Sequence, residues 1–179
     1  KQPVRLAEDL AVIDHISEGR VRFGVGNGYR VEEFEGFDVP LDQRALRLEN
    51  LIEILRKAWD EGTLEHDAHQ ALECGYGCFS FEDIEVTPRP YQENGPPIII
   101  GGFAPPASKR AGRMGDGFTI GSLVGFEEAK GAVDIYWDSV DEAGKDPEEQ
   151  DLVIWNFAFL TDGGDAEGIV EEGWQHTLD

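Results

Sequence analysis

One stretch, residues 16–28, limits the possible folds of this chain more than any other. It runs from a helix end at residues 17–19 through a short strand at 21–25 into the glycine-rich loop 26–28. Alternate strand residues are β-branched or aromatic, and glycine bounds the strand. A helix end, a tight turn, a buried strand and a glycine-rich loop in this order predict one β/α unit. Its loop lies at the carboxyl end of the strand and is of a size to hold a phosphate group.

The alternation of helix and strand continues along the chain. Apolar residues at helical spacing, such as Leu48, Leu55 and Trp59, predict helices. Residues 98–100 form an unbroken apolar run, which is typical of a strand covered on both faces. We therefore expect parallel strands joined by crossover helices. The predicted helices are 6–17, 48–59, 107–114, 133–140 and one that begins at 165; the predicted strands are 21–25, 98–102, 118–122 and 152–160, with a hairpin at 79–86.

The charge of the chain excludes several partners. There are 37 acidic and 15 basic residues, which give a net charge of −22. Such a surface repels nucleic acid and anionic lipid, so we expect neither as a partner. No run of about 18 apolar residues is present to span a bilayer, and residues 1–5 lack the apolar core of a signal peptide, so a cytoplasmic protein is expected. Dispersed acidic residues and few lysines favour a halophilic protein; the alternative is an ordinarily acidic one.

Two sets of residues stand in an order that is found in one enzyme family. The first set comprises Pro3, 6–8, Leu10, 14–20, 23–29, 33–34, Arg44 and Glu49, and the second comprises 88–92, 96–102, Ala111 and 115–118. Together they resemble the luciferase-like monooxygenases, the family of bacterial luciferase, over nearly the whole chain. The resemblance implies an α/β fold that is part of a (β/α)8 TIM barrel. Residues 1–179 would form a single partial domain of about four β/α units, with an irregular insertion at about 63–87.

The resemblance also implies that part of the barrel lies outside this chain. A complete barrel takes about 250 residues, and the early strands and the last strand are absent here. Family members carry their catalytic histidine and much of the substrate pocket on the early strands, so the catalytic residues are unknown. The chain is expected to be either a fragment of a longer protein or a half-barrel that covers its open edges with another chain, which favours a homo-oligomer.

The chemistry that remains in this part of the barrel is cofactor anchoring. Glycines in the loop 26–28 let the backbone approach an anion, and the Asn27 amide can donate a hydrogen bond. The loop 102–106 leads into a helix whose free N–H groups and dipole favour phosphate. By resemblance these two loops grip the phosphate of a flavin, although the family often has hydroxyl residues at Phe103 and Ala104, and one member has a basic residue at Asn27. The alternative is that the glycines only permit tight turns. The predicted cofactor-binding residues are Gly26, Asn27, Gly28, Gly101, Gly102, Phe103, Ala104 and Ser108.

Other polar residues receive structural interpretations. Arg44 and Glu49 are interpreted as an ion pair that orients the loop before the long helix, and His15 as a packing or capping residue. The residues His66, His69, Cys74 and Cys78 resemble a tetrahedral zinc set by type. The spacing between the two pairs is too short for a familiar zinc finger, so a surface insertion without metal is favoured.

The leading functional hypothesis is a flavin-dependent oxidoreductase that acts on a small organic substrate. Reduced FMN would activate O₂, or a deazaflavin coenzyme would transfer a hydride, while the protein supplies orientation and phosphate anchoring. One alternative is a non-catalytic flavin-binding or half-barrel assembly protein that lacks the catalytic strands. A third, weaker hypothesis is a zinc-stabilised structural domain.

Overall fold

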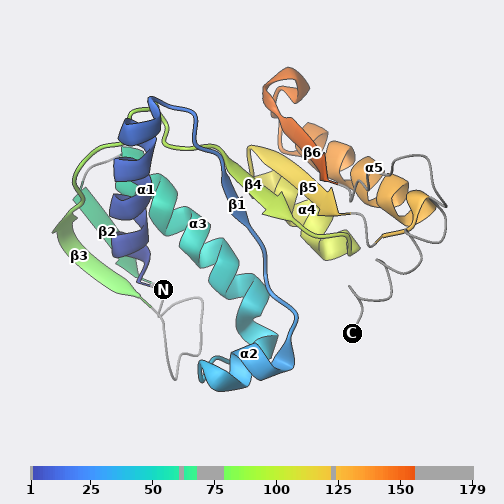
Figure 1. The fold of residues 1–179 in the computed structure, drawn as a ribbon, viewed down its shortest axis with the longest axis horizontal. Coiled ribbons are helices and arrows are strands. Elements are labelled where there is room, and N and C mark those ends of the chain that lie inside the picture. The colour runs from blue at the N-terminus through green and yellow to red at the C-terminus, as the bar shows by residue number, and fades with distance from the viewer. Residues whose placement is uncertain (1, 61–62, 68–78, 122–123, 156–179) are drawn as a thin grey trace, which may run out of the picture.

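A four-stranded parallel sheet dominates the computed structural model, which describes residues 2–60, 63–67, 79–121 and 124–155 (Figure 1). Its strands are β1 (Phe23–Val25), β4 (Ile98–Gly101), β5 (Gly117–Gly121) and β6 (Asp151–Trp155). They lie side by side in the order β1-β4-β5-β6, and every neighbouring pair is parallel. The order in space follows the order along the chain, as it does for consecutive strands in the wall of the expected barrel. The predicted parallel sheet is confirmed.

Two helices cover one face of this sheet. Helix α4 (Pro105–Met114) connects β4 to β5, and α5 (Phe126–Glu142) connects β5 to β6, with the short 3₁₀ helix η2 (Pro147–Glu149) before β6. The two helices approach closely because a Cβ added at Gly112 would lie 2.6 Å from the Cβ of Ser139. The ring of Phe118 on β5 stacks on Tyr136 of α5 with 5.2 Å between centroids. Part of the apolar core therefore lies between the sheet and these helices, and the same cluster continues to Leu10, Leu55 and Trp59.

A second pair of helices lies beside β1 (Figure 1). Helix α1 (Pro3–Ser17) packs against α3 (Arg44–Asp60), and the buried residues of α3 follow the predicted helical spacing. The Trp59 indole N–H donates to the carbonyl oxygen of Ala7 at 3.3 Å, which ties the two helices together. Between β1 and α3 the chain forms a short helix, α2 (Val31–Gly36), and the 3₁₀ helix η1 (Leu41–Gln43), which the sequence patterns did not predict.

The predicted hairpin within residues 79–86 is wrong. This segment is a single strand, β3 (Ser80–Glu85), and its antiparallel partner is β2 (Thr63–Asp67). The segment thus contains one strand rather than two, and this strand pairs across a longer connection. The predicted strand at 152–160 is described as far as Trp155, and the helix predicted from 165 lies outside the described residues.

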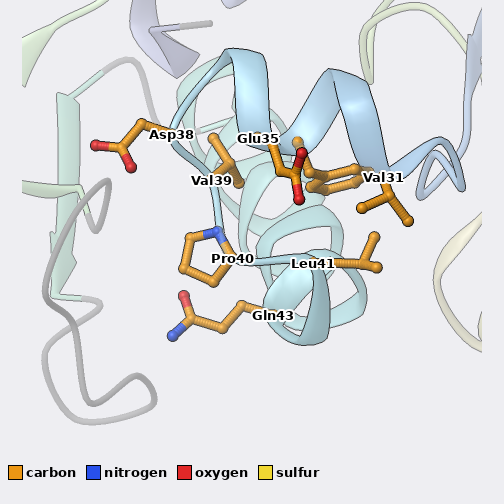
Figure 2. A pocket seen from close by; sticks show the side chains of 8 residues that line it. Val31, Glu35, Asp38, Val39, Pro40, Leu41 and Gln43 are labelled. Carbon is orange, nitrogen blue, oxygen red and sulfur yellow. The ribbon is translucent and has the colours of Figure 1, made fainter.

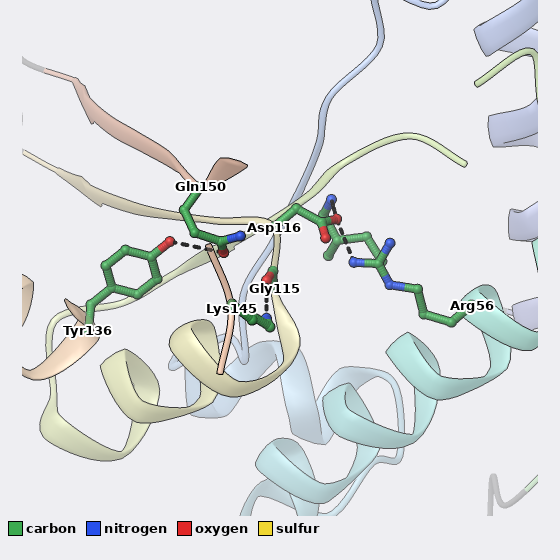
Figure 3. Close-up of polar contacts among 7 residues, drawn as sticks. Arg56, Gly115, Asp116, Tyr136, Lys145 and Gln150 are labelled. Carbon is green, nitrogen blue, oxygen red and sulfur yellow. Dashed lines mark hydrogen bonds and ion pairs between the residues drawn. The ribbon is translucent and has the colours of Figure 1, made fainter. Parts of the chain in front are cut away.

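Ionic and polar contacts occupy the amino edge of the sheet (Figure 3). Asp116 Oδ2 accepts hydrogen bonds from Arg56 Nη2 at 2.5 Å and from the N–H of Ile98 at 2.7 Å. Lys145 Nζ donates to the carbonyl oxygen of Gly115 at 2.6 Å, and burial lowers the pKa of this lysine. These contacts join α3, β4 and β5 where the strands begin. In a barrel this edge serves stability, and ligands bind at the opposite, carboxyl edge.

The helices within the described residues are too short or too polar to cross a bilayer.

Candidate functional site

The loops that follow β1 and β4 meet at the carboxyl edge of the sheet. Val25 pairs in register with Ile100, so the chain leaves both strands at the same level. A Cβ added at Gly26 would lie 3.9 Å from the carbonyl oxygen of Gly101. The structure thus brings together the two glycine loops that the sequence predicts as one site.

Several strand positions on the sheet face opposite α4 and α5 are glycines, which carry no side chain. A Cβ added at Gly24 would meet no atom within 4 Å, and one at Gly101 would meet Thr119 Cγ2 at 3.3 Å. Strand side chains alternate between the two faces, and the buried residues Ile100 and Phe118 point toward the helices. The glycine positions therefore leave backbone open to a ligand on the free face.

Asn27 lies beside a cavity of about 270 Å³ that also contains cationic side chains. Its Oδ1 atom is buried and has no hydrogen-bond partner among the described residues. The same amide group carries two N–H donors. The cavity is formed at the ends of β1, α1 and α3, and its lining residues are Pro3, Gly26, Asn27, Phe34, Val39, Arg44, Arg47, Leu48, Leu51 and Phe79. The buried Oδ1 is an acceptor that calls for a donor, whereas the amide N–H groups and the two guanidinium groups suit a polar, anionic ligand group.

The start of α4 offers fewer donors than predicted. Its first two residues, Pro105 and Pro106, have no N–H, and the next two N–H groups donate to the carbonyl oxygen of Ala104 at 2.8 and 3.2 Å. The predicted free N–H groups of this helix are therefore absent from its first turn. Within the part of the chain that is described, the backbone N–H groups of Phe103 and Ala104 have no hydrogen-bond partner, and they are the donors that remain.

Ser108 does not join the other predicted residues. It is fully buried on the packed side of α4, and its Oγ has no hydrogen-bond partner within the described ranges. A ligand at the loop surface does not reach this hydroxyl in the present arrangement. Gly102 does belong to the loop, where a Cβ would lie 2.5 Å from that of Ala107, so only glycine fits.

The predicted ion pair between Arg44 and Glu49 is wrong. Arg44 Nη1 donates to the carbonyl oxygen of Leu41 at 3.1 Å. Glu49 instead pairs with two arginines of α4, Arg110 Nε at 2.7 Å and Arg113 Nη2 at 2.9 Å. Residues five apart on a helix do not face each other, whereas residues three or four apart do. Glu49 is structural, as expected, but it joins α3 to α4.

The histidines have structural partners. His15 Nε2 lies 2.8 Å from the carbonyl oxygen of Arg89, and its ring meets Tyr91 edge-on, which fits the predicted packing role. His66 Nε2 lies 2.8 Å from Asn50 Nδ2, and both residues are buried. The other members of the zinc hypothesis, His69, Cys74 and Cys78, lie outside the described residues. Within those residues no group of three or more His, Cys, Asp or Glu side chains is arranged for a metal ion.

Two further cavities were not predicted from the sequence. One, of about 450 Å³, lies between α2 and η1 and includes the acidic residues Glu35 and Asp38 (Figure 2). The other, of about 570 Å³, lies between α5 and the strands β5 and β6 and is mostly apolar. Arg47 and Trp155 were also missed, because only the packing of α3 and the pairing of β6 bring them to the carboxyl edge.

Comparison with known proteins gives a family and a set of similar structures. The family model for luciferase-like monooxygenases matches residues 1–168. The sulfoquinovose monooxygenase of Agrobacterium fabrum is 32% identical over 64% of this chain and 27% of its own length. The alkanal monooxygenase alpha chain of Photorhabdus luminescens is 24% identical over 80% of this chain and 38% of its own length.

Solved structures show the same partial coverage. The monooxygenase RslO1 of Streptomyces bottropensis superposes with a TM-score of 0.78 at 25% identity, over 99% of this chain and 52% of that protein. An F420-dependent secondary alcohol dehydrogenase superposes with a TM-score of 0.71 at 19% identity, over 86% of this chain and 44% of its own. The chain thus spans about a quarter to a half of the relatives it matches, and its sheet is part of a luciferase-like TIM barrel.

Proposed function

Because this chain belongs to the luciferase-like monooxygenase family, we propose that it forms the cofactor-anchoring part of a flavin-dependent oxidoreductase. The proposed cofactor is FMN, and the substrate is a small organic molecule. A Baeyer–Villiger monooxygenase solved with FMN has the same fold, at a TM-score of 0.63. Solved F420-dependent enzymes have it as well, which keeps a deazaflavin coenzyme as the alternative.

The observation that carries the proposal is the meeting of Gly26 and Gly101 beside the Asn27 amide. A phosphate group fits such a place because it accepts hydrogen bonds and needs close approach of the backbone. The available donors are the Asn27 amide and the N–H groups of Phe103 and Ala104. FMN and a deazaflavin coenzyme both carry a phosphate, so this anchor serves either one.

Charge supports an anionic ligand at this edge. The chain as a whole carries −22, yet Arg44 and Arg47 line the cavity beside Asn27. Cations placed against a strongly acidic surface raise the local potential where a phosphate has to bind. An anion would otherwise be repelled by this protein, so a local cationic site is needed for its entry.

The roles of the residues follow from their positions. When bound, reduced FMN supplies the electrons that activate O₂ for attack on the substrate. The loops 26–28 and 101–104 hold the phosphate end, and the glycines of β1 and β4 give the cofactor room against the sheet. Arg44 and Arg47 offset the charge of the phosphate. The chain therefore binds and orients, and the groups that handle the substrate are assigned to the remaining part of the barrel.

The complete assembly has to pair the strand edges that are open in the described residues. Here β1 pairs only with β4, and β6 pairs only with β5. We propose that further barrel strands, in the same polypeptide or in a second copy of the chain, cover these edges. We also propose a cytoplasmic location at high salt, where NAD(P)H-linked reduction of flavin is available and the acidic surface is screened.

Binding of FMN and riboflavin to the full-length protein tests the proposal. The two ligands share a ring and a ribityl chain, and only FMN carries the phosphate. Titration in high salt, followed by flavin fluorescence, is expected to show tighter binding of FMN. Asn27→Asp places a negative charge beside the phosphate and should weaken FMN binding about 10- to 100-fold while leaving riboflavin binding unchanged.

A matched control is Asn94→Asp, which makes the same change at an exposed position in the loop before β4. It should alter neither affinity. Equal binding of FMN and riboflavin by the wild-type protein would rule out the phosphate anchor. Binding of a deazaflavin coenzyme with no binding of FMN would favour the alternative cofactor, and binding of neither would refute the proposed function.

A further inference from the structure

The last residue of β6, Trp155, borders the apolar cavity beside α5, and its indole lies over the sheet face that carries no helix within the described residues. Trp155 pairs in register with Gly121 of β5. A Cβ added at Gly121 would come within 2.6 Å of the indole Cε2 atom, so the indole lies directly over this glycine. Ile120, the neighbour of Gly121, is buried toward the helices. Because side chains alternate along a strand, Gly121 and the indole face the opposite, free side.

On this side glycines alternate with the side chains of Ile99 on β4 and Thr119 on β5, and the larger indole stands at the border on β6. Gly24, Gly26 and Gly101 have no side chains, and Thr119 is the neighbour that Gly101 touches. The Trp155 side chain remains 48% exposed. A floor of glycines with an indole at one border matches a flat aromatic ring, since such rings gain from contact with another aromatic group.

We propose that Trp155 binds the planar ring of the cofactor by aromatic contact. The inference rests on the proposed function, because it assigns the second end of the ligand whose phosphate lies near Asn27. Asn27 follows β1, and β1 and β6 are three strand spacings apart, roughly 14 Å. The ribityl chain and the ring together cover that distance, so one molecule reaches from the loops of β1 and β4 to the indole on β6.

Riboflavin is the probe that isolates the ring, because it has no phosphate. Trp155→Ala in the full-length protein should weaken riboflavin and FMN binding by the same factor, about three- to tenfold. Trp155→Phe keeps a ring and should recover most of the affinity. The pattern differs from that of Asn27→Asp, which affects FMN alone, so the two ends of the cofactor are read separately.

A second variant reaches the indole without changing it. Gly121→Ala places a methyl group where the ring lies, and it should displace the ring and cause a similar loss of riboflavin affinity. The matched control is Trp137→Ala, since Trp137 lies on α5 against Tyr136, in the helix layer. Circular dichroism on every variant confirms that binding is compared between folded proteins.

The outcomes separate the inference from the function. Loss of riboflavin affinity in the Trp155 and Gly121 variants, with no loss in the Trp137 control, supports the ring contact. Unchanged riboflavin binding in folded Trp155→Ala overturns the ring contact while FMN binding still supports the function. A wild-type protein that binds no flavin or deazaflavin refutes both.

Discussion

The fully buried carboxylate of Asp14 accepts two hydrogen bonds from Gln92, one from the backbone N–H at 2.9 Å and one from the side-chain amide at 2.8 Å. The same amide group donates to the carbonyl oxygen of Val21 at 3.2 Å. Asp14 lies in the last turn of α1, Val21 precedes β1 and Gln92 precedes β4. These contacts therefore fix the two glycine-bearing strands relative to each other from their amino ends.

Removal of this carboxylate should destabilise the protein strongly. Asp14→Ala leaves two donors of Gln92 without a partner, and we expect a loss of about 2–3 kcal/mol in the free energy of unfolding. Urea denaturation followed by circular dichroism measures it. Asp9→Ala is the control on the same helix, because Asp9 makes an exposed pair with Arg5 at 3.0 Å and should cost under about 0.5 kcal/mol. Equal losses in the two variants would contradict the role of Asp14.

Gly95 and Gly144 allow the cost of backbone strain to be measured apart from the cost of a side-chain clash. Gly95 has φ +79° and a Cβ there would come within 2.6 Å of Trp59 Cδ2, whereas Gly144 has φ +67° and nothing within 4 Å. Gly144→Ala should cost about 1 kcal/mol, from backbone strain alone. Gly95→Ala should cost about 3 kcal/mol, because overpacking adds to that strain. Thermal unfolding of both variants measures the difference, and a difference near zero would mean that Trp59 moves aside freely.

Tyr136 should make the protein sensitive to alkali. Burial, followed by the nearby charges of Asp151 and Asp116, raises the pKa of Tyr136 to about 12 from an ordinary value of 10. The unfolded chain therefore loses this proton at lower pH than the folded one. The stability that this shift contributes is fully present below pH 10 and is lost between pH 10 and about 12, which lowers the free energy of unfolding by up to roughly 3 kcal/mol.

The Tyr136→Phe variant has no phenol to titrate, so its stability should fall less over this pH range. Urea midpoints at several pH values between 8 and 11.5 measure the slope. Tyr29→Phe serves as the control, because Tyr29 is exposed, and its slope should match the wild type. A Tyr136→Phe slope equal to that of the wild type would exclude the phenol as the cause.

Salt should stabilise this chain. The net charge of −22 means that the acidic side chains repel one another in the folded protein. The screening length falls from about 10 Å at 0.1 M salt to about 3 Å at 1 M, which weakens this repulsion. We expect the melting temperature to rise steadily as KCl is raised from 0.1 to 2 M. Sucrose at matched osmolality is the control, because it strengthens burial without screening charge. A melting temperature that responds equally to both would contradict the halophilic interpretation.

The sequence predicted the elements better than their partners. Hydrophobic periodicity and the positions of glycine and proline located the four parallel strands, the long helix with Leu48 and Trp59, and the glycine loops, because these signals are local. The partner of Glu49 could not be found this way, since Arg110 and Arg113 reach it only after α4 packs on α3. The two prolines at the start of α4 were visible in the sequence, and weighing their missing N–H groups would have corrected the donor count there.

The contact between Gly26 and Gly101 also dictates when the site can exist during synthesis. The two glycines are separated along the chain by α2, α3 and the β2–β3 ribbon, so a ribosome exposes the first loop long before the second. Closing such a distance has an entropic cost that only the packed sheet repays. Affinity for the cofactor therefore cannot appear in a nascent chain that stops before β4. Capture of flavin by stalled chains of increasing length would report the moment at which this half of the barrel closes.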